Sequence, residues 1–339
     1  MNQRFQNAIN RREQKTPPIW MMRQAGRYHQ HYQQLRLKHS FEELCKMPKL
    51  AAEVARGPVA DFDFDVAILF SDILFPLEGL GTGLQYTEQG PKLSQQLSSE
   101  NIKNLKSPSE AACFLLFQGE AMRATRAVLP AEKSLIGFVG GLWTLFVYAV
   151  EGSHSGALIT SKKNPRLFHQ FMEIMVPLMK ANIKDQLDSG AEVVMIFDTA
   201  AGELSSSAFK AEVESYLLQL ANHFPGQLGY YSRGTQPDFF TNEFLQAPWA
   251  GMGVDHRWNL STAFALRNTG FLQGNFDQSL LFQEPEVFRN TLEKYLQNVK
   301  SVPLAQRMSW VCALGHGVLP KTPEENVRYF VRRSREVFS

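Results

Sequence analysis

Short apolar runs recur along this 339-residue chain, and each is followed by a polar or glycine-containing turn and then by a longer helical pattern. Uninterrupted apolar runs of this length are typical of strands buried on both faces, as in parallel sheets. The pattern predicts eight strands: PIWMM (18–22), VAILF (66–70), LIGFV (135–139), VVMIF (193–197), QLGYY (227–231), GMGV (251–254), FLQGN (271–275) and MSWVC (308–312).

Helical periodicity lies between these runs, at 41–57, about 165–187, 284–299 and 321–338. In the last segment Thr322 is placed to cap the helix N-terminus, Pro323 occupies the first turn and Glu325 completes a capping box. Eight strands alternating with helices predict a (β/α)8 TIM barrel. A doubly wound open sheet is the alternative, but no GxGxxG follows the first strand.

Composition narrows the kinds of partner to expect. Hydrophobic residues make up 44% of the chain and charged residues 20%, enough for one large domain or two ordinary ones. The 35 Lys and Arg residues nearly balance 33 Asp and Glu residues, and the net charge of +2 argues against nucleic acid as the partner. Any bound anion must therefore be held by a local cluster of cations.

Cysteine usage and the lack of long apolar stretches indicate the compartment. Cys45, Cys113 and Cys312 are too few and too scattered for a disulfide framework or a CxxC metal site, which favours a reducing, cytoplasmic location. The first residues, MNQRFQNAINRREQ, contain no apolar core of a signal peptide, and no apolar stretch approaches the ~18 residues of a membrane span. We expect neither a signal sequence nor a membrane partner.

Polar side chains follow nearly every predicted strand. In a barrel the loops after the strands form the active site, so these side chains are expected at one mouth. Each of these residues alone is equally explained as a polar turn residue. Together they combine arginines, a few carboxylates and one histidine near the C-terminus, a set suited to binding an anionic small molecule. The set is Arg23 and Gln24, Ser71 and Asp72, Trp143 and Tyr148, Asp198 and Thr199, Ser232 and Arg233, Asp255 and His256, Asp277, and His316.

Six blocks of the sequence resemble the uroporphyrinogen decarboxylase family. They run in the family's order over residues 17–327, and they are PPIWMMRQAGRY, FDFDVAILFSDIL, LIGFVGGLWTLFVYAVEG, GAEVVMIFDTAAGEL, LQGNFD and GHGVLPKTPEENV. The resemblance implies one barrel domain over 1–339, usually a homodimer, that needs no metal or organic cofactor. It also implies conversion of the four acetate side chains of uroporphyrinogen III to methyl groups, giving coproporphyrinogen III in haem biosynthesis.

Family roles carry over to matching positions of this chain. The resemblance makes Arg23, Arg27 and Arg36 carboxylate contacts and Asp72 the carboxylate that faces the pyrrole N–H groups. Gln24, Tyr148, Thr199 and His316 are expected as further substrate contacts, and the catalytic set comprises Asp72, Arg23 and Tyr148.

Residue chemistry agrees with these roles. A substrate with eight carboxylates needs a local concentration of cations, which the arginines supply. Asp72, a carboxylate within the apolar run LFSDILF, is suited to stabilise a pyrrole ring that has become cationic by protonation. Three proton donors fit the sequence, namely Arg23, a water held by Asp72 and a carboxylic acid of the substrate.

The chain also departs from the family pattern. It reads RYHQHYQQLR where RYLPEYR is common, GLWTL for APWTL, DTAAG for DSWAG and EGSHS for EGGGS, so that Ala200 stands in place of a tryptophan. These changes keep two alternatives open. One is a catalytically weakened paralogue that binds porphyrinogens. The other is a zinc-dependent cobamide or methylthiol methyltransferase of the same superfamily, which is disfavoured because no His-X-Cys motif occurs and Cys312 and His316 lack a third ligand.

Overall fold

The computed structural model describes residues 1–87, 90–154 and 156–339. Seven parallel strands form one curled sheet in the order β1-β4-β5-β6-β7-β8-β9, which follows the order of the strands in the sequence. A separate antiparallel hairpin pairs β2 with β3. The strands are β1 (Val66–Ile68), β2 (Leu84–Thr87), β3 (Gly90–Leu93), β4 (Ser134–Gly140), β5 (Val193–Asp198), β6 (Leu228–Ser232), β7 (Gly251–Gly253), β8 (Phe271–Phe276) and β9 (Trp310–Leu314).

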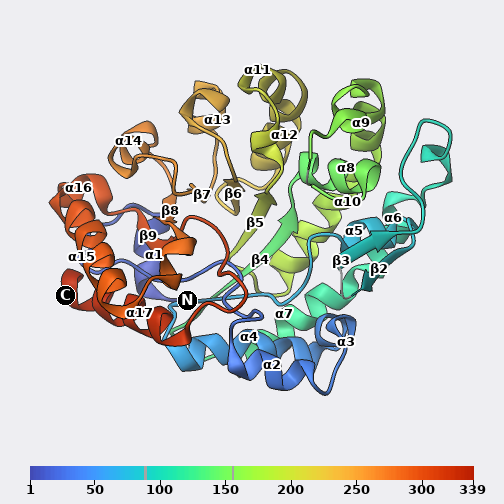
Figure 1. The fold of residues 1–339 in the computed structure, drawn as a ribbon. Helices are drawn as coiled ribbons and strands as arrows, with labels where there is room; N and C mark the ends of the chain where they lie inside the picture. The colour runs from blue at the N-terminus through green and yellow to red at the C-terminus, as the bar shows by residue number, and fades with distance from the viewer. Residues whose placement is uncertain (88–89, 155) are drawn as a thin grey trace.

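Helices surround the strands on the outside (Figure 1). The blue helix α1 lies beside the strands β8 and β9 near the C-terminal end of the sheet. The helices are α1 (Gln3–Ile9), α2 (Gln30–Arg36), α3 (Phe41–Lys46), α4 (Pro48–Phe62), α5 (Phe75–Gly79), α6 (Pro108–Phe114), α7 (Leu116–Val128), α8 (Leu142–Glu151), α9 (Ile159–Lys162), α10 (Pro165–Asp188), α11 (Ser206–Ala208), α12 (Glu214–His223), α13 (Asn242–Gln246), α14 (Leu260–Leu266), α15 (Pro285–Ser301), α16 (Leu304–Arg307) and α17 (Glu324–Phe338).

The predicted first strand, PIWMM, is reduced to a single bridging residue. Ile19 pairs with Cys312 of β9 in a parallel bridge, and Pro18 O accepts the Cys312 N–H at 2.9 Å. On its other side Ile19 O accepts the Asp65 N–H just before β1, also at 2.9 Å. The segment therefore occupies the eighth position and closes the barrel. Pro17 and Pro18 have no N–H to donate, which prevents a longer ladder.

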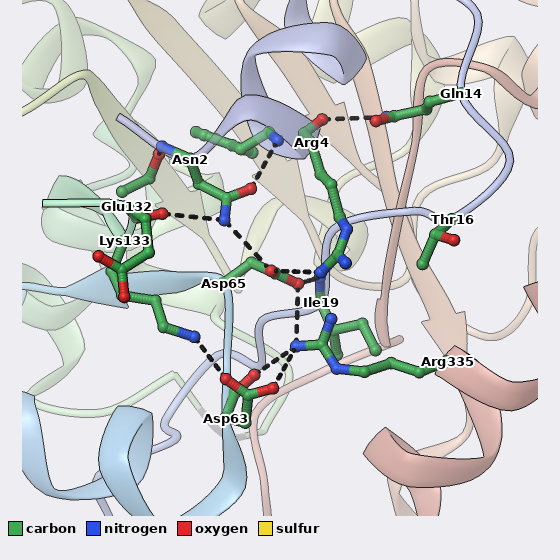
Figure 2. Close-up of polar contacts among 12 residues, drawn as sticks. Asn2, Arg4, Gln14, Thr16, Ile19, Asp63, Asp65, Glu132, Lys133 and Arg335 are labelled. Atoms are coloured by element: carbon green, nitrogen blue, oxygen red, sulfur yellow. Dashed lines mark hydrogen bonds and ion pairs between the residues drawn. The ribbon is translucent and has the colours of Figure 1, made fainter. Parts of the chain in front are cut away.

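A buried carboxylate holds this closing segment in place. Asp65, which is 1% exposed, accepts the Ile19 N–H at 2.8 Å, and the side chains of Asn2, Arg4 and Arg335 also donate to its two oxygens or pair with them (Figure 2). Because Asp65 lies before β1, this network belongs to the N-terminal face of the barrel. That face usually supports stability, whereas the opposite face carries the active site.

The predicted helices are found with local corrections. The segment 41–57 breaks into α3 and α4 at Met47, whose extended backbone is the conformation favoured before a proline. The predicted capping box of the last helix is wrong, because Thr322 donates its hydroxyl to Leu319 O and no side chain caps α17. The hairpin β2–β3 was not predicted. Within the described residues, no helix is long and apolar enough to cross a membrane.

Candidate active site

An apolar cavity opens where β1, β4 and β5 end and the closing segment passes. Its floor is formed by hydrophobic side chains, and its polar groups come from Arg23, Ser71, Asp72 and Thr199. The lining residues are Met22, Arg23, Ala25, Ile68, Leu69, Phe70, Ser71, Asp72, Ile73, Phe138, Phe197 and Thr199. A flat apolar ligand with polar groups at its rim matches this arrangement.

Among the described residues, Asp72 supplies the one carboxylate that lines this cavity. Its Oδ1 accepts the Leu74 N–H at 2.8 Å, a local turn bond two residues along the chain, so Asp72 is not the cap of α5. Burial raises the pKa of Asp72, and the Leu74 N–H and the Arg23 charge partly oppose the shift. The buried Tyr86 hydroxyl lies near the carboxylate without the geometry of a full hydrogen bond. The carboxylate is thus incompletely satisfied by the protein.

Arg23 extends beside the same cavity from a strained backbone. Its φ of 58° lies in the left-handed region, which non-glycine residues rarely adopt and which is held only where the surroundings demand it. Its side chain is exposed and packs against Gly317. Within residues 1–87, 90–154 and 156–339 its guanidinium has no hydrogen bond or ion pair.

The two other predicted arginines are also exposed. Arg27 precedes α2, and Arg36 ends it, donating from Nη1 to His39 O at 2.5 Å. In the part of the chain that the structure describes, neither forms an ion pair with a carboxylate. The closing segment and α2 thus present three cations without acidic partners, as a polycarboxylate ligand requires.

His316 follows β9 and is nearly buried against Tyr231 of β6. The two rings stack with centroids 5.9 Å apart and planes 16° apart, and His316 Nδ1 lies 2.9 Å from the Tyr231 hydroxyl. Burial lowers the pKa of His316 to about 3, and the charges of Arg23 and Arg233 add to the shift. The imidazole is therefore neutral at physiological pH and shares its surroundings with two arginines.

Tyr148 on α8 forms a second tyrosine–histidine pair. Its hydroxyl lies 2.6 Å from His154 Nδ1, and the ring centroids are 5.3 Å apart. Burial and the charge of Asp72 raise the pKa of Tyr148 to about 12, against an opposing effect of the Arg23 charge. These interactions put Tyr148 within electrostatic range of the cavity's two charged groups.

Gln24 and Asp198 face the protein itself. Gln24 is fully buried, and its amide donates to Val66 O at 3.2 Å and accepts from Met21 N–H at 3.5 Å. Asp198 is fully buried and accepts two bonds from Thr144, at 2.9 Å from the N–H and 2.6 Å from the hydroxyl. Gln24 thus joins its segment to β1, and Asp198 joins β5 to α8; neither lines the cavity, whereas Thr199 does.

Two residues near the mouth were given no substrate role in the prediction: Arg233, which was expected at the mouth only, and His154. Arg233 follows β6, is exposed, and its charge lowers the pKa of both His316 and His154. Arg233 was identifiable from its place after a predicted strand, but no motif singled it out. His154 had no partner pattern in the sequence, because its contact with Tyr148 depends on the turn after α8.

The side chains that could ligate a metal ion do not form a cluster in the described residues. Among the described residues, no group of three or more His, Cys, Asp or Glu side chains is placed to hold one. Cys312 is fully buried and contacts Ser334 of α17 at 3.6 Å, while His316 contacts Tyr231 of β6. The two residues that a zinc site would need therefore contact different elements of the barrel.

An apolar cavity at the mouth of an α/β barrel, lined by the cation of Arg23 and the carboxylate of Asp72, defines a barrel protein with a site for a small molecule. The family model for uroporphyrinogen decarboxylase (URO-D) matches residues 1–337. The chain therefore belongs to the uroporphyrinogen decarboxylase family.

Relatives match along nearly the whole chain. Uroporphyrinogen decarboxylase from Francisella philomiragia is 33% identical over 350 residues, covering 99% of both chains. The enzyme of that name from Prochlorococcus marinus is 35% identical over 342 residues, covering 95% of this chain and 93% of its own. A solved methyltransferase from Methanosarcina mazei is 17% identical with a TM-score of 0.78, covering 99% of this chain and 98% of that one. This last likeness shows the shared barrel fold alone.

Proposed function

We propose that this protein is a lyase that removes the four acetate carboxyl groups of uroporphyrinogen III as CO2 and gives coproporphyrinogen III in haem and tetrapyrrole biosynthesis. Family membership over residues 1–337 supports this activity. The structural observation that carries it is that Asp72 and Arg23 line one apolar cavity and that, within the described residues, neither side chain forms an ion pair.

Three arginines hold substrate carboxylates in this proposal. Arg23 lines the cavity, whereas Arg27 and Arg36 are exposed on and just before α2 and are proposed to contact the outer carboxylates of the substrate. Guanidinium groups bind carboxylates in bidentate geometry and stay charged after desolvation. Eight substrate carboxylates supply the acidic partners that the described part of the chain does not give to these arginines.

Asp72 accepts hydrogen bonds from the pyrrole N–H groups and stabilises the cationic ring. Protonation of a pyrrole carbon creates an electron sink, the C–CO2 bond breaks, and its electron pair enters the ring. The resulting exocyclic methylene takes up a proton to become a methyl group, and the ring carbon releases its proton, so that each cycle consumes one proton net. A fixed carboxylate close to the developing cation lowers the barrier of this sequence.

Tyr148, Thr199 and His316 are proposed as further substrate contacts, with Tyr148 next to the catalytic pair of Asp72 and Arg23. Gln24 supports the site from behind, because the protein backbone uses both ends of its amide. We further propose one domain over the whole chain, a homodimer and a cytoplasmic location. Light scattering of the purified protein tests the dimer directly.

Anaerobic turnover of uroporphyrinogen III tests the activity. We expect release of four equivalents of CO2 and formation of coproporphyrinogen III. Tight binding without CO2 release would instead establish a porphyrinogen-binding paralogue. Raising the salt concentration should increase KM more than it changes kcat, because exposed charges are screened beyond ~10 Å at 0.1 M.

A further inference from the structure

Two hydrogen bonds meet at the Tyr231 hydroxyl, one with the Gly315 carbonyl and one with the His316 ring. The Tyr231 hydroxyl lies 2.8 Å from Gly315 O and 2.9 Å from His316 Nδ1. A carbonyl oxygen can only accept a hydrogen bond, so the single hydroxyl proton is directed to Gly315. The hydroxyl oxygen is then the acceptor toward His316, and Nδ1 must carry a proton to donate to it.

The other ring nitrogen has a different environment. Among the described residues, Nε2 of His316 has no hydrogen-bond partner, and it is not among the buried atoms that lack one, so solvent at the mouth reaches it. Burial and the charges of Arg23 and Arg233 lower the pKa of the ring and keep a second proton off it. A neutral imidazole with its proton on Nδ1 has a lone pair at Nε2.

We propose that Tyr231 is a positioning residue that fixes the proton of His316 on Nδ1, so that Nε2 meets the substrate as a hydrogen-bond acceptor. The inference deepens the proposed function, on which its substrate assignment rests. The arginines bind the substrate carboxylates, and the imidazole accepts a hydrogen bond from a substrate group that carries a proton, which is a pyrrole N–H or a carboxylic acid. Stacking against the Tyr231 ring fixes the plane of the imidazole and so the direction of the Nε2 lone pair.

The test is the nitrogen NMR spectrum of the 15N-histidine-labelled protein. We expect a protonated Nδ1 and an unprotonated Nε2 for His316 in the free wild type, with its signals assigned by loss in His316→Gln. Tyr231→Phe keeps the stacked ring but removes the hydroxyl, so the proton should redistribute between the two nitrogens. Tyr230→Phe removes the neighbouring hydroxyl, which lies 3.4 Å from Asp198, and should leave the pattern unchanged.

Kinetics separate positioning from a structural role. Tyr231→Phe should lower kcat/KM about three- to tenfold, the value of one ordinary hydrogen bond. His316→Gln keeps an acceptor oxygen, and in that background Tyr231→Phe should have no further effect, because its role passes through the imidazole. Additive losses would show that Tyr231 acts through packing.

Binding of the product coproporphyrinogen III, which the enzyme does not consume, tests the acceptor. Its addition should shift the Nε2 signal. For a pyrrole N–H the shift should be the same at pH 5 and pH 7, whereas for a carboxylic acid it should weaken from pH 5 to pH 7, since carboxyl groups ionise near pH ~4.3. A protonated Nε2 in the free wild type, or a Tyr231→Phe variant with an unchanged spectrum, would overturn the proposal. The spectra of the free protein test the position of the His316 proton without any substrate. They can therefore support or overturn this proposal independently of whether the proposed decarboxylase activity is found.

Discussion

The side chain of Arg23 lies directly over the Cα of Gly317, and a Cβ at position 317 would come within 2.5 Å of Arg23 Cδ and 2.8 Å of its Cγ. Gly317 therefore provides the space that lets an arginine on a left-handed backbone reach the cavity. The glycine after His316 in the GHG motif thus makes room for Arg23, 294 residues earlier in the sequence.

Gly317→Ala should displace Arg23 and lower kcat/KM by about 10- to 100-fold, since displacements near 1 Å in positioning groups have effects of this size. Activity assays with uroporphyrinogen III, together with urea unfolding, measure the two consequences separately. Gly226→Ala is the matched control, because its φ of 74° makes alanine strained while nothing lies within 4 Å of the added methyl. The control should lose about 1 kcal/mol of stability and keep its activity.

Asp72→Asn should lower kcat by about 10²- to 10³-fold, because an amide cannot stabilise the cationic ring and its NH2 group faces N–H donors. Asp72→Glu keeps the charge but moves it, and we expect partial activity with release of incompletely decarboxylated products. Since burial raises the pKa of Asp72, wild-type kcat should fall as the pH drops through that raised value, and Asp72→Asn should lack this fall. Near wild-type kcat in folded Asp72→Asn would remove Asp72 from the mechanism.

Arg23→Lys should be severely impaired, because an ammonium group cannot replace a bidentate guanidinium. Arg27→Ala should raise KM most for the substrate with the full set of carboxylates, with less effect on partly decarboxylated intermediates. Steady-state kinetics on both substrates, with folding checked by circular dichroism, distinguish these outcomes. Arg56→Ala is the matched control, since Arg56 is a half-exposed arginine of α4 that pairs with Glu53.

The hydrophobic pattern was enough to predict seven of the eight strand positions and the barrel. The pattern could not reveal that PIWMM contributes only one bridge residue. The length of its strand ladder is limited by two prolines and by the hydrogen bond from Ile19 N–H to the side chain of Asp65. The hairpin β2–β3 was missed because its strands, LQYT and GPKL, are mostly half-buried or exposed and lack an apolar run.

The sequence allowed us to predict which loops carry the residues of the candidate site, but not which partners their side chains contact. The position after a strand placed Arg23, Asp72, Thr199 and His316 at one mouth, and the structure brings the first three to one cavity. The pairing of Tyr148 with His154 and the burial of Gln24 depend on side-chain directions that spacing does not encode.

The stability of the protein should fall in acid partly through His316. Its pKa is about 3 in the native state but near 6.5 in the unfolded chain, so the unfolded state binds the extra proton between these values. His316 therefore contributes no destabilisation above pH 6.5, and it favours unfolding by up to about 1.4 kcal/mol for each pH unit below that. Urea titrations from pH 7 to pH 5 should show a shallower loss for His316→Asn than for the wild type, and an equal loss would contradict the assigned shift.

Asp65 and Asp63 provide a matched pair for the barrel's closure, since both contact Arg335 from positions two residues apart (Figure 2). Asp65 is buried and holds the Ile19 N–H, whereas the Asp63 side chain is 68% exposed. Asp65→Asn should reduce the free energy of unfolding by about 3 kcal/mol or more, because it leaves buried cationic and N–H donors incompletely paired.

Asp63→Asn should cost less than about 1 kcal/mol, because surface ion pairs contribute little and asparagine tolerates the left-handed φ of 56° at this position. Urea unfolding measures both variants. Asp65 precedes β1 and Asp72 follows it, so the two carboxylates lie at opposite ends of the barrel. Folded Asp65→Asn should therefore keep wild-type kcat/KM, and a loss of activity without a loss of stability would show that the closing segment sets the position of Arg23.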